Sequence, residues 1–593
     1  MTNSDEKKND GFEKVYDYVG GSGWFQWRLL LITSLQLIIV TWHHIGYSFL
    51  GAVPDHWCKI EDLETRTNWT LTEIKRLSIP RTVKSDSGEF SYDKCHYYNL
   101  NYASLADTSE SFEEAFSKTS YEGVEILECT QWDFDRTIYK TTIPSEFQLV
   151  CGRRWMTATI QSSYMAGGLV GTVFFGTVSD KFLGRRKTIL ISLTIVVVCG
   201  LAAAFAKSYW IFLLLRFFTS IGVSGSIQNC FVLVMEHADI KYRALLGMLE
   251  QIPFAIGYMI LPLLAYFIRD WAMLQLSFGL ISLTLVSYLW WVPESPRWLA
   301  THGNEEDSLK YLLRMAKVNK FPKPSKEALL EYIRQAHQQP PPREQEERVL
   351  ENGEVNLKSA SSKFKHRLRG VAENFKKLMS TAEIRKRSLV FWTIFLTVSM
   401  VYYGLVFSTN LTSDPFLLVF LGGLMEIPAY LLTPIPASKL GRRPTTCATF
   451  MLTGVCMLGL SQIDSSYETT RIVLAMLAKF FISSTFAIIY LLGAELYPTE
   501  MRTTGLAVGI FCGRLGGGSA PYIVDLLQHI GKDFASVIFG VSAVAAGLVA
   551  LGLPETRVLE MADNVHEVEK QAVEIKEKRR MSRMSITDGL TQL

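Results

Sequence analysis

Long apolar stretches alternate with short polar segments along most of this chain. The stretches at 188–206 (TILISLTIVVVCGLAAAFA) and 535–553 (ASVIFGVSAVAAGLVALGL) each approach the length of about 18 to 20 residues that crosses a bilayer as a helix. Counting such stretches predicts twelve transmembrane helices, over residues 29–53, 157–178, 188–206, 209–230, 244–268, 272–293, 388–408, 415–437, 444–461, 470–492, 502–525 and 533–553. The pattern indicates an all-α polytopic membrane protein.

Basic residues of the short connections fall mostly on one side of this predicted bundle. LGRRK (183–187), KYR (241–243), LGRRP (440–444) and EMR (500–502) all lie there. By the positive-inside rule we expect these loops and both termini in the cytoplasm, in a multi-pass protein of the plasma membrane. Residues 1–28 are charged and lack a cleavable signal pattern, so they are predicted as a cytoplasmic N-terminus.

The first long connection, 54–156, has the composition of an extracellular domain. It carries the glycosylation signal NWT at Asn68 and four cysteines, Cys58, Cys95, Cys129 and Cys151. We expect this loop to be disulfide-bonded and glycosylated, the alternative being free thiols and an unused signal. Four cysteines allow three pairings, and the sequence does not choose among them.

The remaining polar segments are predicted on the cytoplasmic side. Segment 294–387 joins helices 2–6 (157–293) to helices 7–12 (388–553) and contains a linker-like QQPPPREQEER. Within it, SLKYLLRMAKVNK has the apolar spacing of a helix that lies on the inner membrane face. The tail, 554–593, ends in Thr591-Gln592-Leu593, which is typical of a ligand for a PDZ-domain protein and is also short enough to arise by chance.

The chain contains an internal repeat. Three motifs recur in order at nearly one offset: Gly184 and Gly441 (441−184=257), Glu236 and Glu495 (495−236=259), and the PES and PET motifs that start at 293 and 554 (554−293=261). A common offset for different motifs indicates duplication of a six-helix unit. Two such halves predict a transporter built from parallel repeats, with a substrate cavity between them near the middle of the membrane.

The repeated motifs have the chemistry of a gate. Each half places a Gly-Arg-Arg turn, and a Glu seven residues before an Arg, at predicted cytoplasmic helix ends. Arginines can bind helix C-termini and carboxylates, so we expect these motifs to lock the inner ends when the cavity faces outwards. The predicted gate residues are Asp180, Gly184, Arg185, Arg186, Arg216, Glu236, Arg243, Gly441, Arg442, Arg443, Glu495 and Arg502. The second copy has Ser438-Lys439 where the first has Ser179-Asp180, so the gate is expected to be asymmetric.

Four segments together resemble the organic-ion transporter family of the major facilitator superfamily. They are GGLVGTVFFGTVSDKFLGRRK, the Arg216 segment LLLRFFTSIGVSG, VPESPRWL and AELYPTEMR. The resemblance covers nearly the whole chain, although relatives often have more than four cysteines in the large loop. AIGYMILPLLAYFIRDWAML, WWVPESPRWL and MEIPAY most resemble the carnitine and zwitterion branch. The resemblance implies a transporter of small organic ions and not an enzyme.

A candidate substrate site follows from charges inside predicted spans, where they are costly and mark functional sites. The resemblance matches Arg514, in FCGRLGGGSAP, to a position that is acidic in organic cation carriers and basic in anion and carnitine carriers. A guanidinium can bind a carboxylate through two parallel hydrogen bonds. Glu426 supplies the opposite charge, with Tyr430 one turn further on the same face; some anion carriers of the family have a lysine near that tyrosine position. The pair predicts a zwitterionic ligand such as carnitine, a betaine or β-alanine.

Aromatic residues are expected to complete an ammonium site by cation–π contact, and the resemblance places Tyr402, Tyr403 and Phe231 there. Their alternative role is simple packing. Lys479 has three possible roles: binding substrate, binding a coupling ion or pairing with an acid such as Glu426.

Two further alternatives concern the charged site itself. Glu426 and Arg514 could neutralise one another as a buried ion pair without a ligand. His43 and His44 in the first span suggest proton coupling, because imidazole titrates near neutral pH, or they form a hydrogen-bonded wall.

Three hypotheses for function remain open. The first is a zwitterion carrier, the second an organic anion exchanger that uses Arg514 and Lys479, and the third a receptor or scaffold that keeps the fold without transport. Nothing in the sequence resembles a nucleotide-binding loop, a metal cluster or a nucleic-acid-binding motif, and no cofactor is expected. Energy must then come from gradients, by uniport, exchange or coupling to sodium or protons.

Overall fold

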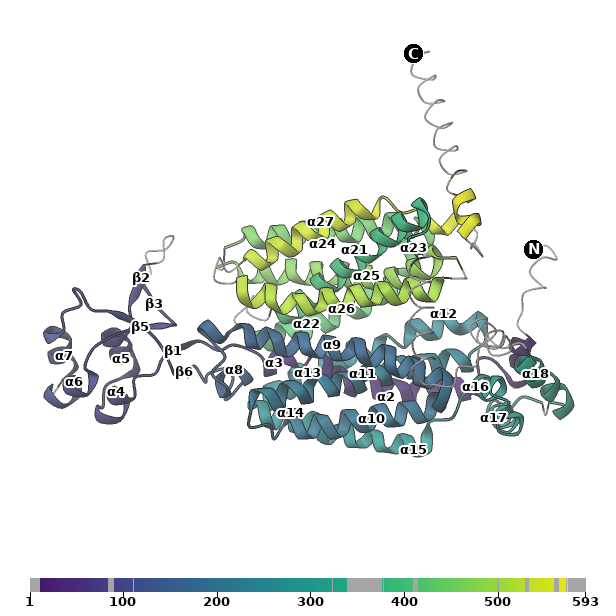
Figure 1. Cartoon of the computed structure of the whole chain (residues 1–593), viewed down its shortest axis with the longest axis horizontal. Coiled ribbons are helices and arrows are strands. Elements are labelled where there is room, and N and C mark those ends of the chain that lie inside the picture. Colours follow the sequence, from purple (N-terminus) through teal and green to yellow (C-terminus); the bar gives the residue numbers. More distant parts are fainter. Residues whose placement is uncertain are drawn as a thin grey trace, which may run out of the picture.

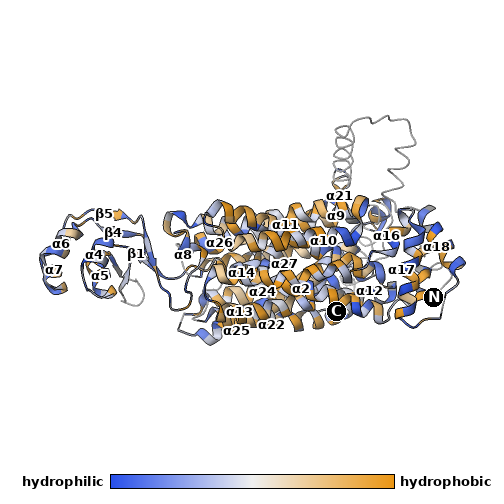
Figure 2. Cartoon of the chain, turned by 90° about the horizontal axis from the view of Figure 1, so that it is seen from below, coloured by the Kyte–Doolittle hydropathy of each residue, from blue (hydrophilic) through white to orange (hydrophobic). Residues whose placement is uncertain are grey.

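The computed structural model describes residues 11–83, 90–109, 111–322, 324–338, 376, 378–408, 414–464, 466–498, 501–527, 533–558, 565–571 and 573. Most of the helices run side by side in one elongated bundle, with a β-containing domain at one end and short helices at the other (Figure 1). Hydrophobic residues dominate the middle of the bundle, and hydrophilic residues gather towards its two ends (Figure 2). This is the distribution expected of a protein that spans a membrane.

Each of the twelve predicted spans coincides with a helix or a pair of helices. The first half consists of α2 (Trp24–Ile45), α9 (Trp155–Val178), α10 (Gly184–Ala203), α11 (Tyr209–His237), α12 (Ile240–Leu249) with α13 (Ile252–Phe267), and α14 (Trp271–Ser282) with α15 (Tyr288–Trp291). The second consists of α21 (Ala382–Phe407), α22 (Pro415–Leu432), α24 (Arg442–Gln462), α25 (Glu468–Leu496), α26 (Arg502–Leu527) and α27 (Phe534–Ala550). Within the described residues, nine helical segments are long and apolar enough to cross a membrane. The predicted all-α membrane fold is confirmed.

Helix boundaries differ from the apolar pattern where local chemistry intervenes. Helix α2 begins before residue 29, at Trp24, because the Gln26 side chain accepts a 2.9 Å hydrogen bond from the Gly23 N–H and caps this end. The span expected at 244–268 is divided into α12 and α13, and Pro253 lies in the first turn of α13. Proline suits a first turn because its missing N–H has no helical partner there.

The segment between α2 and α9 forms a small mixed domain. Its strands pair antiparallel as β1 (His56–Cys58) with β6 (Trp132–Phe134), β2 (Arg81–Val83) with β3 (Phe90–Tyr92), and β4 (His96–Tyr98) with β5 (Ile126–Glu128). Helices α4 (Glu61–Arg66), α5 (Leu71–Ser78), α6 (Tyr102–Thr108) and α7 (Phe112–Lys118) bury a separate apolar core, and α8 (Ile143–Glu146) leads back to the bundle.

The cysteines of this domain form the predicted disulfides. The pairing that the sequence left open is Cys58–Cys129 and Cys95–Cys151. Asn68 lies exposed between α4 and α5, where a glycan would have room, and its glycosylation stays a prediction. We call this end of the molecule the loop-domain end.

The opposite end, which carries Gly184 and Gly441, we call the Gly-Arg-Arg end. Here α16 (Pro296–Thr301), α17 (Glu305–Val318) and α18 (Lys326–Gln338) pack on η2 (Gly11–Lys14) and α1 (Val15–Val19). Helix α17 is the helix predicted from SLKYLLRMAKVNK, but its buried Leu312 packs in a small core with Phe12 and Val15, which the sequence pattern did not indicate. The QQPPPREQEER linker and the PDZ signal at Thr591–Leu593 lie outside the described residues.

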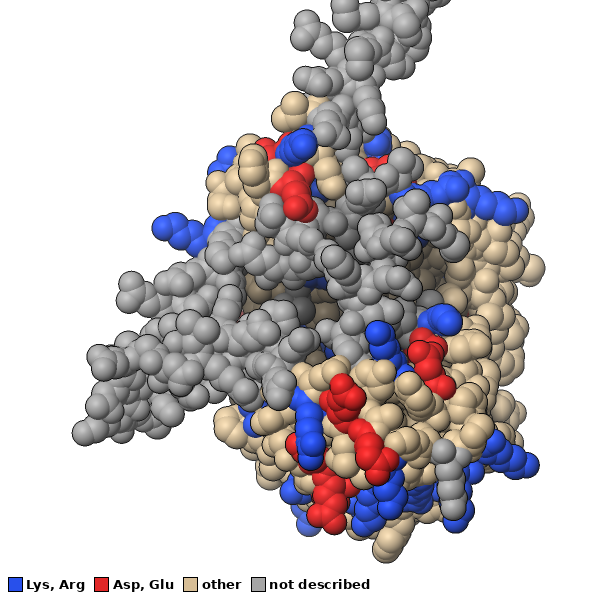
Figure 3. All heavy atoms as spheres, turned by 90° about the vertical axis from the view of Figure 1, so that its right-hand side faces the viewer, with Lys and Arg blue, Asp and Glu red and all other residues tan. Residues whose placement is uncertain are grey.

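The two halves contact each other near the loop-domain end. Phe416 of α22 packs against Phe49 and Tyr266 of the first half, with ring centroids 5.4 and 5.6 Å apart. Between α9 and α26, the Ser162 hydroxyl donates a 2.5 Å hydrogen bond to the Gly518 carbonyl. Viewed from the Gly-Arg-Arg end, the molecule is hollowed between the halves (Figure 3). This hollow lies at the end opposite to the Phe416 contacts between the halves (Figure 3).

Candidate substrate site and gate

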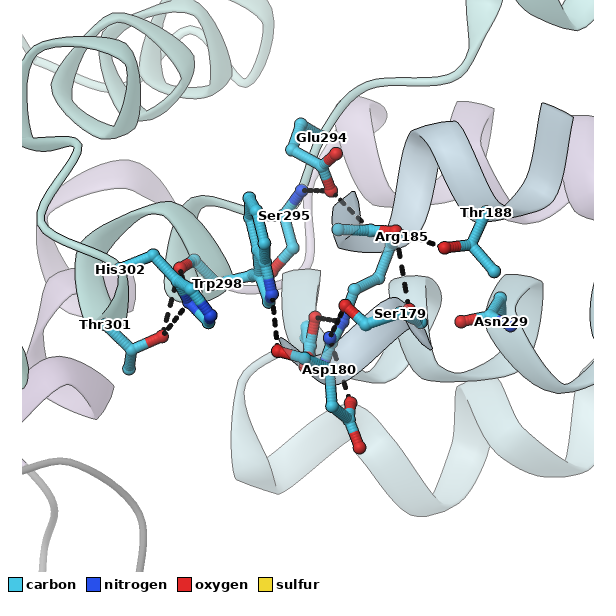
Figure 4. A network of polar contacts seen from close by, with 12 residues as sticks. Ser179, Asp180, Arg185, Thr188, Asn229, Glu294, Ser295, Trp298, Thr301 and His302 are labelled. Carbon is cyan, nitrogen blue, oxygen red and sulfur yellow. Dashed lines mark hydrogen bonds and ion pairs between the residues drawn. The ribbon is translucent and has the colours of Figure 1, made fainter. Parts of the chain in front are cut away.

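The first gate cluster lies where α9 ends and α10 begins (Figure 4). A short π-helix, η4 (Ser179–Leu183), leads to Gly184, whose φ of 77° is unfavourable for residues with a side chain. The Arg185 guanidinium, which follows directly, lies 3.0 Å from the Asp180 carboxylate and 2.6 Å from that of Glu236. It therefore joins three helix ends of the first half.

A carboxylate that the sequence analysis did not assign stabilises the same turn. Glu294 of the PES motif accepts hydrogen bonds from the backbone N–H groups of Arg185 (2.8 Å), Arg186 (3.3 Å) and Ser295 (2.9 Å). It thus caps the N-terminus of α10, where the helix dipole favours a negative charge. Burial raises the pKa of Glu294, and these N–H donors oppose that rise.

The second half repeats this construction. Glu555 of the PET motif accepts hydrogen bonds from the backbone N–H groups of Arg442 (2.9 Å) and Arg443 (3.1 Å), after Gly441 with φ of 112°. The Arg442 guanidinium lies 3.1 Å from the Glu495 carboxylate. The common offset of PES and PET was the signal that could have identified both capping glutamates.

The two clusters differ where the sequences differ. Lys439 replaces the acid at the Asp180 position, and its backbone carbonyl accepts a hydrogen bond from Arg557. In the first half, the Asp180 carbonyl accepts the corresponding bond from the Trp298 ring at 2.9 Å. The second turn therefore keeps a backbone contact and loses an ion pair.

The other predicted gate residues lie nearby. Arg243 donates to the carbonyls of Met235 and Ala238, both at 3.1 Å, and Arg502 begins α26. The ion pairs of Arg185 with Asp180 and Glu236, and of Arg442 with Glu495, each stay within one half. These pairs therefore stabilise the helix ends of their own half.

Arg216 does not join the gate. It lies two turns from the start of α11, about 30 Å along that helix from Glu236 at 1.5 Å per residue. Its fully buried guanidinium donates to the His43 carbonyl at 2.8 Å and to Gln161 at 3.3 Å, and it lies 4.4 Å from the Tyr164 ring centroid. Its prediction as a gate residue is therefore wrong, because a sequence motif gives no information on depth in the membrane.

We predict that Gly184→Ala slows transport and lowers thermal stability. Alanine at φ of 77° costs about 1 to 3 kcal/mol of backbone strain, and its β-carbon would also lie 2.6 Å from the Glu294 carboxylate. Gly123→Ala is the matched control, because Gly123 has the same φ of 77° and no atom within 4 Å of such a β-carbon. Thermal unfolding and uptake rates measure both variants. If the two variants lowered thermal stability and uptake equally, the close approach to Glu294 would contribute nothing to the effect of Gly184→Ala.

The candidate substrate site contains a buried ion pair. Glu426 of α22 has no exposed surface, and its carboxylate lies 2.8 Å from the ammonium of Lys479 on α25. The same carboxylate accepts hydrogen bonds from Tyr402 at 2.5 Å and Tyr430 at 3.4 Å. Lys479 also lies 3.5 Å from the Tyr402 ring centroid. Of the roles that the sequence left open for Lys479, the structure shows pairing with Glu426.

Arg514 lies apart from this pair. A β-carbon built on Gly168 of α9 would lie 3.6 Å from its guanidinium carbon, so the side chain crosses from the second half to the first. Within the described part of the chain, Arg514 forms no ion pair with a carboxylate. The alternative in which Glu426 and Arg514 neutralise one another as a buried ion pair is therefore not seen in this conformation, where Glu426 pairs with Lys479.

The glycines after Arg514 allow close helix packing. A β-carbon on Gly516 would lie 2.1 Å from the Leu396 carbonyl oxygen, and one on Gly517 would lie 2.7 Å from the Tyr403 ring. Only glycine permits α26 to approach α21 this closely. This glycine run thus brings Arg514 beside the aromatic residues of α21.

An aromatic wall lines the second half near Arg514. Tyr402 and Tyr403 meet edge to face at 5.1 Å, and Tyr402 packs against Phe486, which in turn packs against Tyr490. Tyr490 remains 42% exposed although its helix is packed within the bundle. Neither Phe486 nor Tyr490 was predicted from the sequence; their spacing from Lys479, of seven and eleven residues on one helix, was the available signal.

The two histidines and Phe231 have different positions. The His44 ring nitrogen lies 2.8 Å from the Tyr403 hydroxyl, at the contact between the halves. His43 lies 3.0 Å from the Ser282 hydroxyl, inside the first half. Phe231 of α11 is 38% exposed and lies beside α12, where a β-carbon built on Gly247 would lie 3.7 Å from its ring.

Comparison with solved structures shows the fold. The fold is similar to the inward-open xylose transporter XylE of E. coli, with a TM-score of 0.53 at 18% identity over 72% of this chain and 93% of that one. A partially occluded inward-open form gives 0.54 at 16% identity over 91% and 100%. These likenesses are below 25% identity and show the fold: the duplicated helical bundle is that of the xylose transporter XylE.

Sequence comparison defines the family. Solute carrier family 22 member 7 of Pongo abelii is 30% identical over 95% of this chain and 97% of its own length. Member 3 of Rattus norvegicus is 30% identical (94% and 96%), and an organic cation transporter protein of Drosophila melanogaster is 29% identical (94% and 94%). The chain belongs to the sugar (and other) transporter family, whose model matches residues 98–565, and within it to solute carrier family 22. The predicted resemblance to organic-ion transporters is confirmed; the carnitine branch stays a prediction.

Proposed function

We propose that this chain carries small organic zwitterions, of the carnitine, betaine or β-alanine type, by alternating access. The observation that carries the proposal is Arg514, a cation without a carboxylate partner among the described residues, beside an aromatic wall. Its guanidinium would bind the substrate carboxylate through two hydrogen bonds. The exposed ring of Tyr490 would face the ammonium group by cation–π contact.

Glu426 has a second role in this proposal. Its carboxylate is neutralised by Lys479, whose ammonium already lies over the Tyr402 ring. Lys479 thus holds the place that a substrate ammonium would take, as a tethered cation of the same kind. The ammonium group of a zwitterion would either displace the Lys479 ammonium from Tyr402 or bind at the neighbouring rings of the aromatic wall, Phe486 and Tyr490.

The second candidate function is organic anion exchange, and one observation favours it. With Glu426 paired to Lys479, the buried Arg216 and the half-buried Arg514 each pair with no described carboxylate. The charges of these four residues sum to +2. Such a field attracts anions without requiring an ammonium group.

The orientation is also a proposal. We infer that the Gly-Arg-Arg end faces the cytoplasm and the loop domain faces the exterior of the plasma membrane. The basic loops at the former end support this by the positive-inside rule, and the two disulfides of the loop domain fit an oxidising compartment. A PDZ-domain partner for the tail, and a sodium or proton as coupling ion, stay predictions.

Uptake by cells that express the chain separates the candidates. Labelled carnitine or β-alanine is tested against three unlabelled competitors: a zwitterion, a dicarboxylate without an amine, and a permanent cation without a carboxylate. The proposal expects competition by the zwitterion alone. Competition by the dicarboxylate, with labelled dicarboxylate uptake, would establish the anion exchanger instead. Absence of uptake for every compound, with the chain at the surface, would favour a receptor or scaffold.

A further inference from the structure

A cleft at the Gly-Arg-Arg end lies outside the candidate substrate site. It is formed by the start of α2, the end of α15 and one face of α17, and it is open to the solvent. Its lining is basic and aromatic, with Arg28, Arg186, Arg314, Trp290, Trp291 and Tyr311 among its residues. No Asp or Glu is found among the residues that line it.

The arginines of the cleft have unused binding capacity. In the part of the chain that the structure describes, none of the three forms an ion pair. Arg186 donates one hydrogen bond to the Leu289 carbonyl at 2.6 Å, but its buried Nε has no described hydrogen-bond partner. Arg28 contacts the Trp291 ring, 5.7 Å from its centroid. Three cations without a countercharge in one concave site favour an anionic ligand.

Exposed tryptophans place the cleft at the membrane surface. Trp290 is 75% and Trp291 55% exposed at the end of α15, and Trp24 is 64% exposed at the start of α2. Tryptophan gathers where the headgroups of a bilayer meet its acyl chains. A ligand in the cleft would therefore lie at headgroup depth, with the tryptophan rings beside the acyl region.

We propose that this cleft binds the phosphate-bearing headgroup of an anionic phospholipid, in the leaflet at the Gly-Arg-Arg end. The planar guanidinium matches phosphate oxygens through paired hydrogen bonds, which a lysine cannot reproduce. The apolar rings of Trp290 and Trp291 would pack against the glycerol and upper acyl chain. The proposed orientation makes this the cytoplasmic leaflet, which is the anionic one.

The site is placed to influence the gate. Arg186 follows Arg185 of the first gate cluster, and its backbone N–H is held by Glu294. A headgroup on Arg186 would thus hold the start of α10 from the membrane side. Lipid would stabilise conformations in which α2, α15 and α17 form the cleft.

The test uses the full chain in phosphatidylcholine nanodiscs, with and without phosphatidylinositol bisphosphate, and measures lipid adducts by native mass spectrometry and thermal stability. The variant is Arg28→Gln with Arg314→Gln, which leaves Arg186 of the gate intact. Its matched control is Lys317→Gln with Arg385→Gln, two exposed basic residues of the same end outside the cleft.

The proposal expects the cleft variant to lose about tenfold or more in lipid affinity, because two of the three cations that would bind the headgroup phosphates are removed. The control variant should bind as the wild type does. Equal losses in both variants would overturn the proposal in favour of general surface charge. Binding of soluble inositol trisphosphate as tight as that of the lipid would also overturn it, and would assign the cleft to a soluble anion. Uptake of labelled carnitine or β-alanine is measured in parallel, so that a failure of the lipid proposal can be distinguished from a failure of the proposed function.

Discussion

Replacing Arg514 by alanine is expected to reduce kcat/KM for zwitterion uptake by roughly 100-fold, because the substrate carboxylate loses two charge-assisted hydrogen bonds worth about 3 kcal/mol together. The side chain forms no described ion pair, so its removal strands no acid and should spare folding. Uptake of labelled carnitine or β-alanine, normalised to surface biotinylation, measures the effect.

Arg514→Lys is the matched variant for this prediction. It keeps the positive charge but replaces the planar fork with a point charge, so an intermediate loss of about tenfold is expected. A structural arginine would behave differently. If Arg514→Ala lowered the surface level and left the specific uptake per transporter unchanged, the carboxylate role would be refuted.

The architecture was predictable because its signals are long or repeated. Apolar stretches of bilayer length and a repeat at one offset both survive errors of a few residues in any boundary. The gate pairs of Arg185 and Arg442 followed from the same repeat, since equivalent motifs must occupy equivalent helix ends. Glu294 and Glu555 escaped notice only because their motifs were treated as markers of the repeat and not as ligands of a helix N-terminus.

The substrate site was less predictable because it depends on which residues face each other across helices that are distant in sequence. Glu426, Lys479 and Arg514 were all identified, but the sequence cannot decide which cation meets the acid. Helix rotation decides it, and rotation is set by packing details such as the contact of Gly516 with Leu396. Arg216 illustrates the same limit, because its motif indicates a family and not a depth in the membrane.

The second large effect is expected at the buried pair. Glu426→Gln leaves the Lys479 ammonium, whose side chain is 3% exposed, without a countercharge, and breaking such a pair costs about 3 to 5 kcal/mol. Lys479→Met leaves the Glu426 carboxylate without a countercharge and should lower the free energy of unfolding by a similar amount. Both single variants are expected to unfold at lower temperature and to reach the surface poorly.

The double variant, Glu426→Gln with Lys479→Met, decides what the pair is for. With neither charge left buried, the thermal stability of the double variant should return to near that of the wild type. A double-mutant cycle over the wild type, the two single variants and the double variant would then show a strong coupling between the two substitutions. If Glu426 takes part in ammonium recognition, this stable double variant must still lose zwitterion uptake. If the pair only neutralises itself, the double variant transports normally, and recognition rests on Arg514 and the wall at Phe486 and Tyr490. Dicarboxylate uptake gained by the double variant would show that Glu426 normally excludes anions.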